Sequence, residues 1–104
     1  MYPWPVKRWY VYILRCSDRT LYTGITVDLE RRMEAHRLGA AAKYTRSRRP
    51  VALLYQERQR DRSAALRREA ALRRLGRTGK LALIAARRDT DRPMEDSSWL
   101  DLAE

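Results

Sequence analysis

Apolar and polar residues are arranged in runs that predict three short strands. The run WYVYILRC, residues 9–16, is rich in aromatic and β-branched side chains, and the SDRT that follows it is typical of a tight turn. A second strand is expected over 21–25, which makes the pair an antiparallel hairpin. The run VALLYQE, residues 51–57, follows Pro50 and has strand composition. We expect it to add a third strand to the hairpin.

Capping residues predict the first helix and its limits. Asp28 is a suitable N-cap for a helix over 29–38, and Gly39 is a suitable terminator. The next stretch, AAAKYTRSRRP, has no periodic pattern and is expected to be a loop that carries four cations.

Two further helices are predicted after the third strand. Asp61 or Ser63 begins a helix that runs to Leu75, and Gly76 ends it. Thr78 then caps a helix over about 79–87.

The order β-β-α-β-α-α predicts an α+β fold, in which a small, largely antiparallel three-stranded sheet is flanked by helices. A chain of 104 residues suits one domain. We therefore expect an N-terminal extension over 1–8, a folded domain over 9–88 and an acidic, disordered tail over 89–104. A tail that folds over the basic face as a phosphate mimic is the alternative.

Charge indicates an acidic partner. The chain has 23 Lys and Arg against 13 Asp and Glu, a net charge of +10, and residues 1–88 alone carry +15. This excess is expected of a nucleic-acid-binding protein, although a membrane surface or a ribosome fits it too. Twenty of the cations are arginines, which either reflects phosphate binding or codon use in a GC-rich genome.

Other features of the composition indicate a cytoplasmic protein without a membrane partner. Cys16 is alone, so no intrachain disulfide is possible, and a reducing cytosol fits best. The longest apolar run, 81–86, is far too short to span a bilayer.

Four polar side chains are predicted to converge near the hairpin. On a helical wheel for 29–38, Arg32 and His36 border the stripe that contains Leu29 and Met33. Tyr12 and Tyr22 have the same strand parity, so they share a face if the hairpin register allows it. Two phenols, a guanidinium and an imidazole would then meet.

Each of these residues also has a plainer interpretation. The tyrosines are ordinary strand aromatics with a solvated hydroxyl, and His36 is a packed or surface residue. Arg32 pairs with Asp28 on the same helix. Only their joint occurrence favours a site.

The motifs together resemble a known family. Tyr10-Val11-Tyr12 stands where the GIY element would stand, and Tyr22-Thr23-Gly24 matches the YIG element ten residues later. Asp28-Leu29-x-x-Arg32-x-x-x-His36 resembles the arginine-bearing helix of GIY-YIG endonucleases, and Leu66-Arg67-Arg68-Glu69 resembles the segment that holds their metal-binding glutamate. The resemblance covers 9–87 and is closest to the small stand-alone bacterial members.

The resemblance implies a metal-dependent endonuclease that hydrolyses a DNA phosphodiester with a tyrosine-activated water. Tyr12 would take the proton of that water, and Tyr22 would orient it or the phosphate. Arg32 would stabilise the charge that develops on the phosphate, and neutral His36 would accept a proton from the phenol. Glu69 would hold one Mg²⁺ or Mn²⁺.

The sequence also departs from the family pattern. Tyr10 replaces the GIY glycine, whereas the YIG glycine is present as Gly24, to which we assign a structural role. Where the family has a polar amide in its last helix, the nearest polar residues are Thr78 and Lys80. Glu69 has a plainer interpretation as well, as a surface partner of Arg73 at i+4.

Nucleic-acid binding is predicted for the basic loop. Its candidate phosphate contacts are Lys43, Thr45, Arg46, Arg48 and Arg49. The expected substrate is branched, flapped or nicked DNA in repair or recombination, reached alone or through a protein that delivers it. The alternatives are a non-catalytic basic DNA-binding module and an RNA- or ribosome-associated protein.

Overall fold

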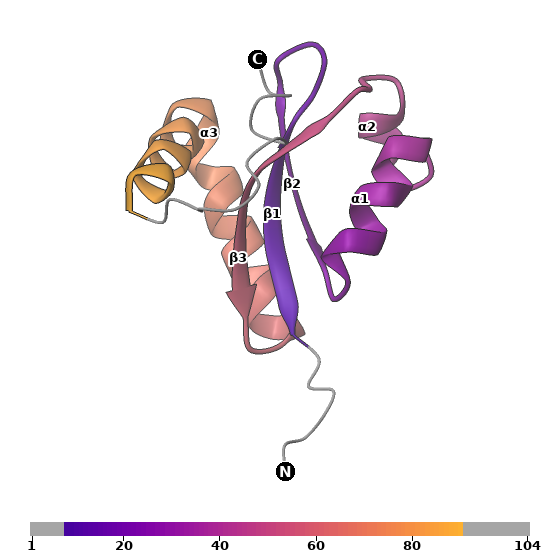
Figure 1. The fold of residues 1–104 in the computed structure, drawn as a ribbon. Helices are drawn as coiled ribbons and strands as arrows, with labels where there is room; N and C mark the ends of the chain where they lie inside the picture. Colours follow the sequence, from indigo (N-terminus) through magenta and orange to yellow (C-terminus); the bar gives the residue numbers. More distant parts are fainter. Residues whose placement is uncertain (1–7, 91–104) are drawn as a thin grey trace.

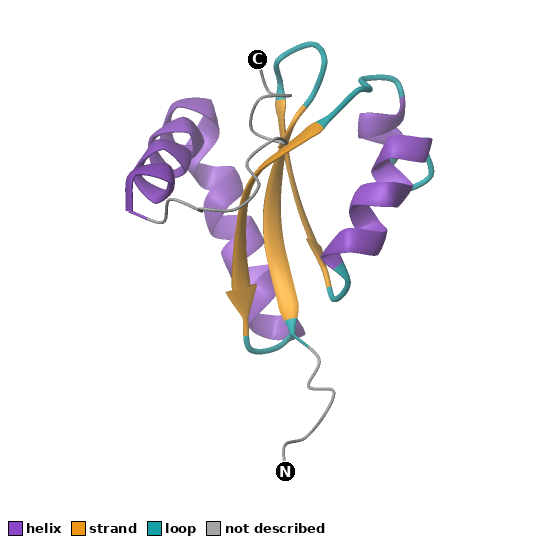
Figure 2. Cartoon of the chain, viewed as in Figure 1, coloured by secondary structure: helices purple, strands orange, loops and turns teal. Residues whose placement is uncertain are grey.

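The chain folds as a three-stranded sheet between helices. The computed structural model describes residues 8–90, and it describes 88–90 by their backbone only. The elements, labelled in Figure 1, are β1 (Trp9–Arg15), β2 (Leu21–Thr26), α1 (Leu29–Leu38), α2 (Lys43–Arg46), β3 (Ala52–Gln59) and α3 (Arg62–Thr90). Figure 2 shows α3 on one side of the sheet and the two shorter helices on the other.

The sheet has the order β2-β1-β3, and both strand pairs are antiparallel. The predicted α+β fold and the addition of the third strand to the hairpin are therefore confirmed. The hairpin register places Tyr12 opposite Gly24 and Leu14 opposite Tyr22. Because side chains alternate along a strand, Tyr12 and Tyr22 lie on the same face, as their parity predicts.

One face of the sheet carries the apolar core. Val11 and Ile13 of the central strand are fully buried against Ala65, Leu72 and Ile84 of α3. Full burial of an aliphatic side chain of this size contributes about 1.5–3 kcal/mol. The opposite face, which α1 and α2 cover, holds Tyr12 and the polar cluster described below.

α1 begins and ends where its capping residues predict. The Asp28 carboxylate accepts a hydrogen bond from the backbone N–H of Arg31 at 3.0 Å. Gly39 adopts a left-handed conformation with φ of 81°, and its N–H and that of Ala40 bond to the last carbonyls of the helix. Any L-residue at Gly39 would be strained.

α3 consists of two helical segments that meet at Gly76, as the sequence predicts, although the second segment begins earlier than expected. Asp61 is its N-cap, since its carboxylate accepts from the N–H of Ala64 at 2.8 Å. Gly76, with φ of 71° and ψ of −178°, does interrupt the helix. Because this one residue makes the whole kink, the helix resumes immediately and not at 79. It extends to Thr90, two residues into the predicted tail; 1–7 and 91–104 lie outside the described residues.

The expectation of a structureless loop over 40–50 is wrong in part, because α2 forms there. Thr45 of this short helix is fully buried and hydrogen bonded to His36. The sequence of this segment has no helical periodicity. A contact with α1 holds the short helix in place, and the local pattern of residues cannot indicate such a contact.

A semi-buried ion pair fastens α3 to β3. Two nitrogens of Arg68 donate to the Glu57 carboxylate at 2.8 and 3.0 Å, and Tyr55 also donates to it. Burial alone would raise the pKa of Glu57, but the bonds from Arg68 and Tyr55 outweigh it and lower the pKa. Glu57 is therefore a charged anchor at neutral pH.

Candidate active site

The ring of Tyr12 lies across Gly24 on the neighbouring strand. A Cβ added at Gly24 would come within 2.5 Å of the Tyr12 hydroxyl and 2.7 Å of its Cζ. Such distances are far below van der Waals contact, so the glycine is needed for the phenol to reach across β2. Because β2 is an edge strand, the hydroxyl is delivered to the edge of the sheet.

A chain of hydrogen bonds leads from that hydroxyl into the protein. Oη of Tyr12 lies 2.9 Å from Nε2 of His36, and Nδ1 of His36 lies 2.8 Å from Oγ1 of Thr45. The Thr45 hydroxyl donates to the backbone carbonyl of Ala42 at 3.3 Å. Since the threonine hydrogen is used there, its oxygen accepts from Nδ1–H, and Nε2 is left as an acceptor for the phenol.

The electrostatics agree with this direction of donation. Burial, and next the charge of Arg32, lower the pKa of His36 to about 4, so the imidazole is neutral at pH 7. Burial is also the main cause that raises the pKa of Tyr12 well above its usual range; Tyr22 adds to this, and the Arg32 guanidinium opposes it. A protonated phenol therefore faces a neutral imidazole.

Arg32 is the cation of the cluster. It comes from α1, one turn before His36, and lies close enough to the Tyr12 hydroxyl to favour its ionised form. The carboxylate of Asp28 is used at the N-cap, where it accepts from Arg31. The structure thus directs Arg32 to the Tyr12 hydroxyl rather than to the alternative partner, Asp28.

Tyr22 belongs to a group of stacked rings. Its centroid lies 6.5 Å from that of Tyr12, and 5.5 Å from that of His36 in an edge-on arrangement. The ring of Tyr44 in α2 stacks on that of Tyr22, with the centroids 5.8 Å apart and an angle of 20° between the planes.

An arginine covers the outer ring of this stack. The guanidinium carbon of Arg48 lies 3.8 Å from the centroid of the Tyr44 ring, and its Nε donates to the Asp18 carboxylate at 3.0 Å.

Glu69 reaches the same strand edge from α3. One of its oxygens accepts from Arg73 at 3.0 Å, and Arg73 also donates to the backbone carbonyl of Thr23 in β2 at 3.3 Å. The Glu69 side chain is only 17% exposed, and its charge contributes to raising the pKa of Tyr12.

Lys80 is one of the two polar residues considered in place of the family amide, and it is buried. Burial, and next the charge of Arg73, lower the pKa of Lys80.

The residues predicted to contact nucleic acid differ in exposure, and only some of them are free to do so. Lys43, Arg46 and Arg49 are exposed; the first two belong to α2, and Arg49 donates to the backbone carbonyl of Arg37 in α1 at 3.2 Å. Thr45 is 0% exposed, so the expectation that it contacts nucleic acid is wrong, and its hydroxyl serves His36 instead. Arg48 is partly occupied by Asp18 and the Tyr44 ring.

The structure brings Tyr12, Tyr22, Arg32 and His36 into one cluster, with Glu69 at its border. Two further members were not predicted as site residues. Arg73 has a visible signal, because it stands four residues after Glu69 on a helix. Tyr44 has none, since its stacking on Tyr22 depends on the short helix α2.

Comparisons with known proteins agree with the geometry. The model of the GIY-YIG catalytic domain matches residues 8–82. A UPF0213 protein of Desulfotalea psychrophila is 53% identical over 75% of this chain and 72% of its own length, and one of Syntrophus aciditrophicus is 53% identical over 72% and 87%. The solution NMR structure of a UPF0213 protein from Bacillus halodurans has 39% identity and a TM-score of 0.51, and the match covers 76% of this chain and 84% of that one.

Proposed function

Because the chain belongs to the GIY-YIG catalytic domain family, which implies a nuclease-type activity on nucleic acid, we propose that it is a metal-dependent DNA endonuclease. The observation that carries this proposal is the hydrogen-bonded chain from Tyr12 through His36 to Thr45, with Arg32 beside the phenol. Such a chain supplies a base for water and a cation for phosphate within one small cluster.

The protons move along that chain in the proposed reaction. A water gives a proton to Oη of Tyr12 while the phenolic hydrogen passes to Nε2 of His36. The resulting hydroxide attacks phosphorus in line, the bond to the 3′ oxygen breaks, and this oxygen takes a proton from solvent. The bound phosphodiester is an anion, and it raises the pKa of the buried imidazole toward the value that the transfer needs. Arg32 stabilises the charge added to the phosphate.

The residues present fit one hard divalent cation. Among residues 8–90, no group of three or more His, Cys, Asp or Glu side chains is placed to share an ion. Glu69 offers a single carboxylate with one oxygen paired to Arg73 and the other without a partner among these residues. Mg²⁺ suits such a site, because it keeps several waters and takes one or two carboxylates plus phosphate oxygens. When bound, it would neutralise phosphate charge and assist the leaving oxygen.

The charge of the α1–α2 side supports a nucleic-acid substrate. Exposed cations there include Arg31, Arg37, Lys43, Arg46 and Arg49. Arginine contacts to phosphate position a strand but carry no sequence information. We therefore infer selection by DNA shape, with branched, flapped or nicked DNA of repair or recombination as substrate and delivery by a protein partner as one route.

One observation favours the binding-module alternative. The Arg73 guanidinium already neutralises Glu69, and a domain that never bound metal would keep this pair permanently. Metal-independent binding without cutting would then be the whole function.

None of the helices in the described part of the chain has a stretch long and apolar enough to cross a bilayer. Cys16 is buried and unpaired, and on this we base the further proposal that the protein works in a reducing cytoplasm.

The experiment that tests the proposal incubates the protein with Mg²⁺ or Mn²⁺ and a panel of branched, flapped, nicked and linear DNAs, with an RNA duplex as a further arm. Nicking of at least one DNA is expected, and Glu69→Ala is expected to abolish it. Glu34→Ala, which removes an exposed carboxylate on α1, is the matched control and should cut normally. DNA binding without cutting in any metal would contradict the enzyme and support the binding module, whereas cutting that survives Glu69→Ala would contradict the role of Glu69 and point to a contaminating nuclease.

A further inference from the structure

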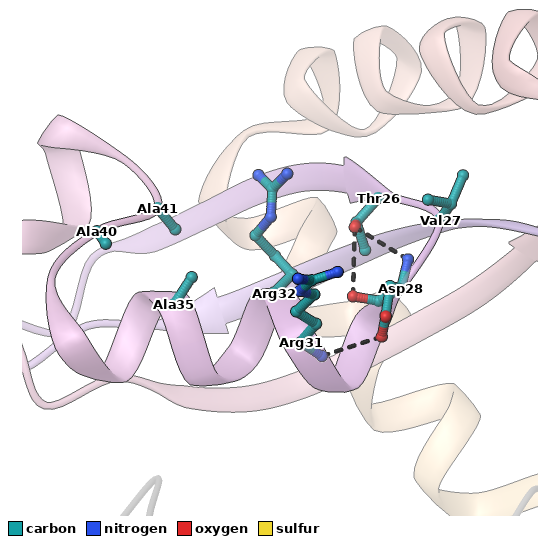
Figure 3. Close-up of a pocket in the computed structure, with 8 residues that line it drawn as sticks. All are labelled: Thr26, Val27, Asp28, Arg31, Arg32, Ala35, Ala40 and Ala41. Atoms are coloured by element: carbon teal, nitrogen blue, oxygen red, sulfur yellow. Dashed lines mark hydrogen bonds between the residues drawn. The ribbon is translucent and has the colours of Figure 1, made fainter.

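A pocket of about 370 Å³ lies between α1 and the segment that follows it. Figure 3 shows Arg31 and Arg32 rising from the helix into the middle of this pocket, with Ala35, Ala40 and Ala41 at one end. Its volume lies within the about 300–1,000 Å³ of small-molecule sites. The proton chain of Tyr12 does not use this space.

The pocket shares one residue, Arg32, with the candidate active site. The guanidinium that interacts with the Tyr12 hydroxyl, and opposes the rise in its pKa, belongs to a residue that also lines the pocket. A phosphate held by Arg32 at the reacting position would therefore have the pocket beside it. The group that is covalently attached to that phosphate would then lie in the pocket.

The chemistry of the lining divides the pocket into two parts. Arg31 and Arg32 favour phosphate oxygens, for which the planar guanidinium is well suited. The three alanines have only methyl side chains, so they leave a small apolar surface on which a flat ring can pack. Asp28, at the opposite end, excludes phosphate and leaves one carboxylate oxygen, without a partner among the described residues, to accept an N–H.

We propose that this pocket binds the nucleoside next to the scissile phosphate, with its base unstacked from the strand. The proposal rests on the proposed function and adds what the substrate must supply. Extruding a base costs a few kcal/mol in a duplex and less where the base is already unpaired. A pocket of this kind therefore selects DNA with an unpaired or loosely stacked nucleotide at the cut, such as a flap or a junction.

The test measures binding without metal, so that it does not depend on cutting. Fluorescence anisotropy compares a flapped DNA with the same DNA made abasic at one nucleotide at a time around the junction. The protein should lose about 10-fold in affinity at one position, because an abasic nucleotide leaves the pocket without the ring that fills it. Ala40→Leu, which fills the pocket from an exposed position, should weaken binding to intact DNA by a similar factor and make the abasic change at that position neutral.

Two controls keep the result interpretable. Ala70→Leu places the same side chain at an exposed site on α3 and should bind as the unchanged protein does. Arg31→Ala should weaken binding more than Arg37→Ala, which removes an exposed arginine from the same helix; this pair decides the matter if Ala40→Leu unfolds.

Three results would overturn the proposal that this pocket binds a nucleoside. One is an affinity that does not change at any abasic position. Another is an Ala40→Leu protein that still discriminates against the abasic position. The last is equal effects of Arg31→Ala and Arg37→Ala. Each of them can occur while Mg²⁺-dependent nicking persists, which separates failure of the pocket from failure of the nuclease. A protein that bound no DNA of any shape would contradict both.

Discussion

Tyr12 donates its phenolic hydrogen to Nε2 of His36 over 2.9 Å, and the imidazole accepts it because Nδ1–H is already committed to Thr45. A phenol alone is a poor base near neutral pH, since its usual pKa is about 10. A phenol that can pass its own hydrogen to a neutral imidazole is a better one. This relationship favours Tyr12 over Tyr22 as the group that activates water.

Thr45→Val should impair turnover without weakening binding. The substitution keeps the shape of the side chain but removes the acceptor that fixes the imidazole, so Nε2 no longer stays a dedicated acceptor for Tyr12. We expect kcat to fall by about 100-fold with little change in KM, the scale of one proton-transfer contribution. Ser47→Ala, which removes an exposed hydroxyl directly after α2, is the control. An unchanged kcat in Thr45→Val would exclude the relay.

The burial of neutral His36 should make stability depend on pH. The folded pKa is lowered from 6.5 to about 4, so below 6.5 the unfolded chain binds the proton first and stability falls as pH decreases. Between about pH 7.5 and about pH 5 the wild type should lose about 2 kcal/mol of unfolding free energy that His36→Gln does not lose. Urea unfolding at the two pH values measures this. Equal losses in both proteins would mean that the imidazole is not buried as a neutral group.

Gly24→Ala should displace the Tyr12 ring. The added Cβ would lie 2.5 Å from the hydroxyl and 2.7 Å from Cζ, and such overpacking costs about 1–3 kcal/mol. Thermal unfolding should show that loss, and turnover should fall because Oη moves away from His36. In a Tyr12→Phe background the nearest atom is gone, so the stability cost should be smaller. The same cost in both backgrounds would place the clash elsewhere.

Glu57→Gln should loosen α3 from the sheet. The Glu57 side chain is 13% exposed but that of its partner Arg68 is 37% exposed, so breaking the pair should cost about 1–3 kcal/mol, less than for a fully buried pair. Because its folded pKa is lowered, this stabilisation is present above the ordinary value of 4.5 and is lost as pH falls below it. Urea unfolding at neutral and acid pH should show both effects. Glu34→Gln, in an exposed pair, should show neither.

The elements that the sequence predicts well have signals within a few residues. Asp28 and Gly39 cap α1 through their own neighbours, and the shared parity of Tyr12 and Tyr22 sufficed to place them on one face. Motif order added Glu69, whose helix arrives from a distant part of the chain.

The missed features depend on contacts between distant residues. α2 forms where Thr45 meets His36, nine residues away, and no periodicity reports such a bond. The role of Thr45 was mistaken for the same reason, because a threonine within a basic loop gives no sign of burial. The break at Gly76 was predicted, but the immediate restart of the helix after it could not be foreseen, since a glycine that ends one helix can be followed by a linker or directly by the next turn.

Single-turnover cleavage of a flapped DNA in Mg²⁺ by Tyr12→Phe, beside Tyr22→Phe and Tyr10→Phe, measures whether the Tyr12 hydroxyl activates the attacking water. We expect Tyr12→Phe to lose about 100-fold or more in the rate of the chemical step. Tyr22→Phe should lose less, and Tyr10→Phe should cut at the wild-type rate. Cleavage by Tyr12→Phe at the wild-type rate would show that the hydroxyl bonded to His36 does not activate the water.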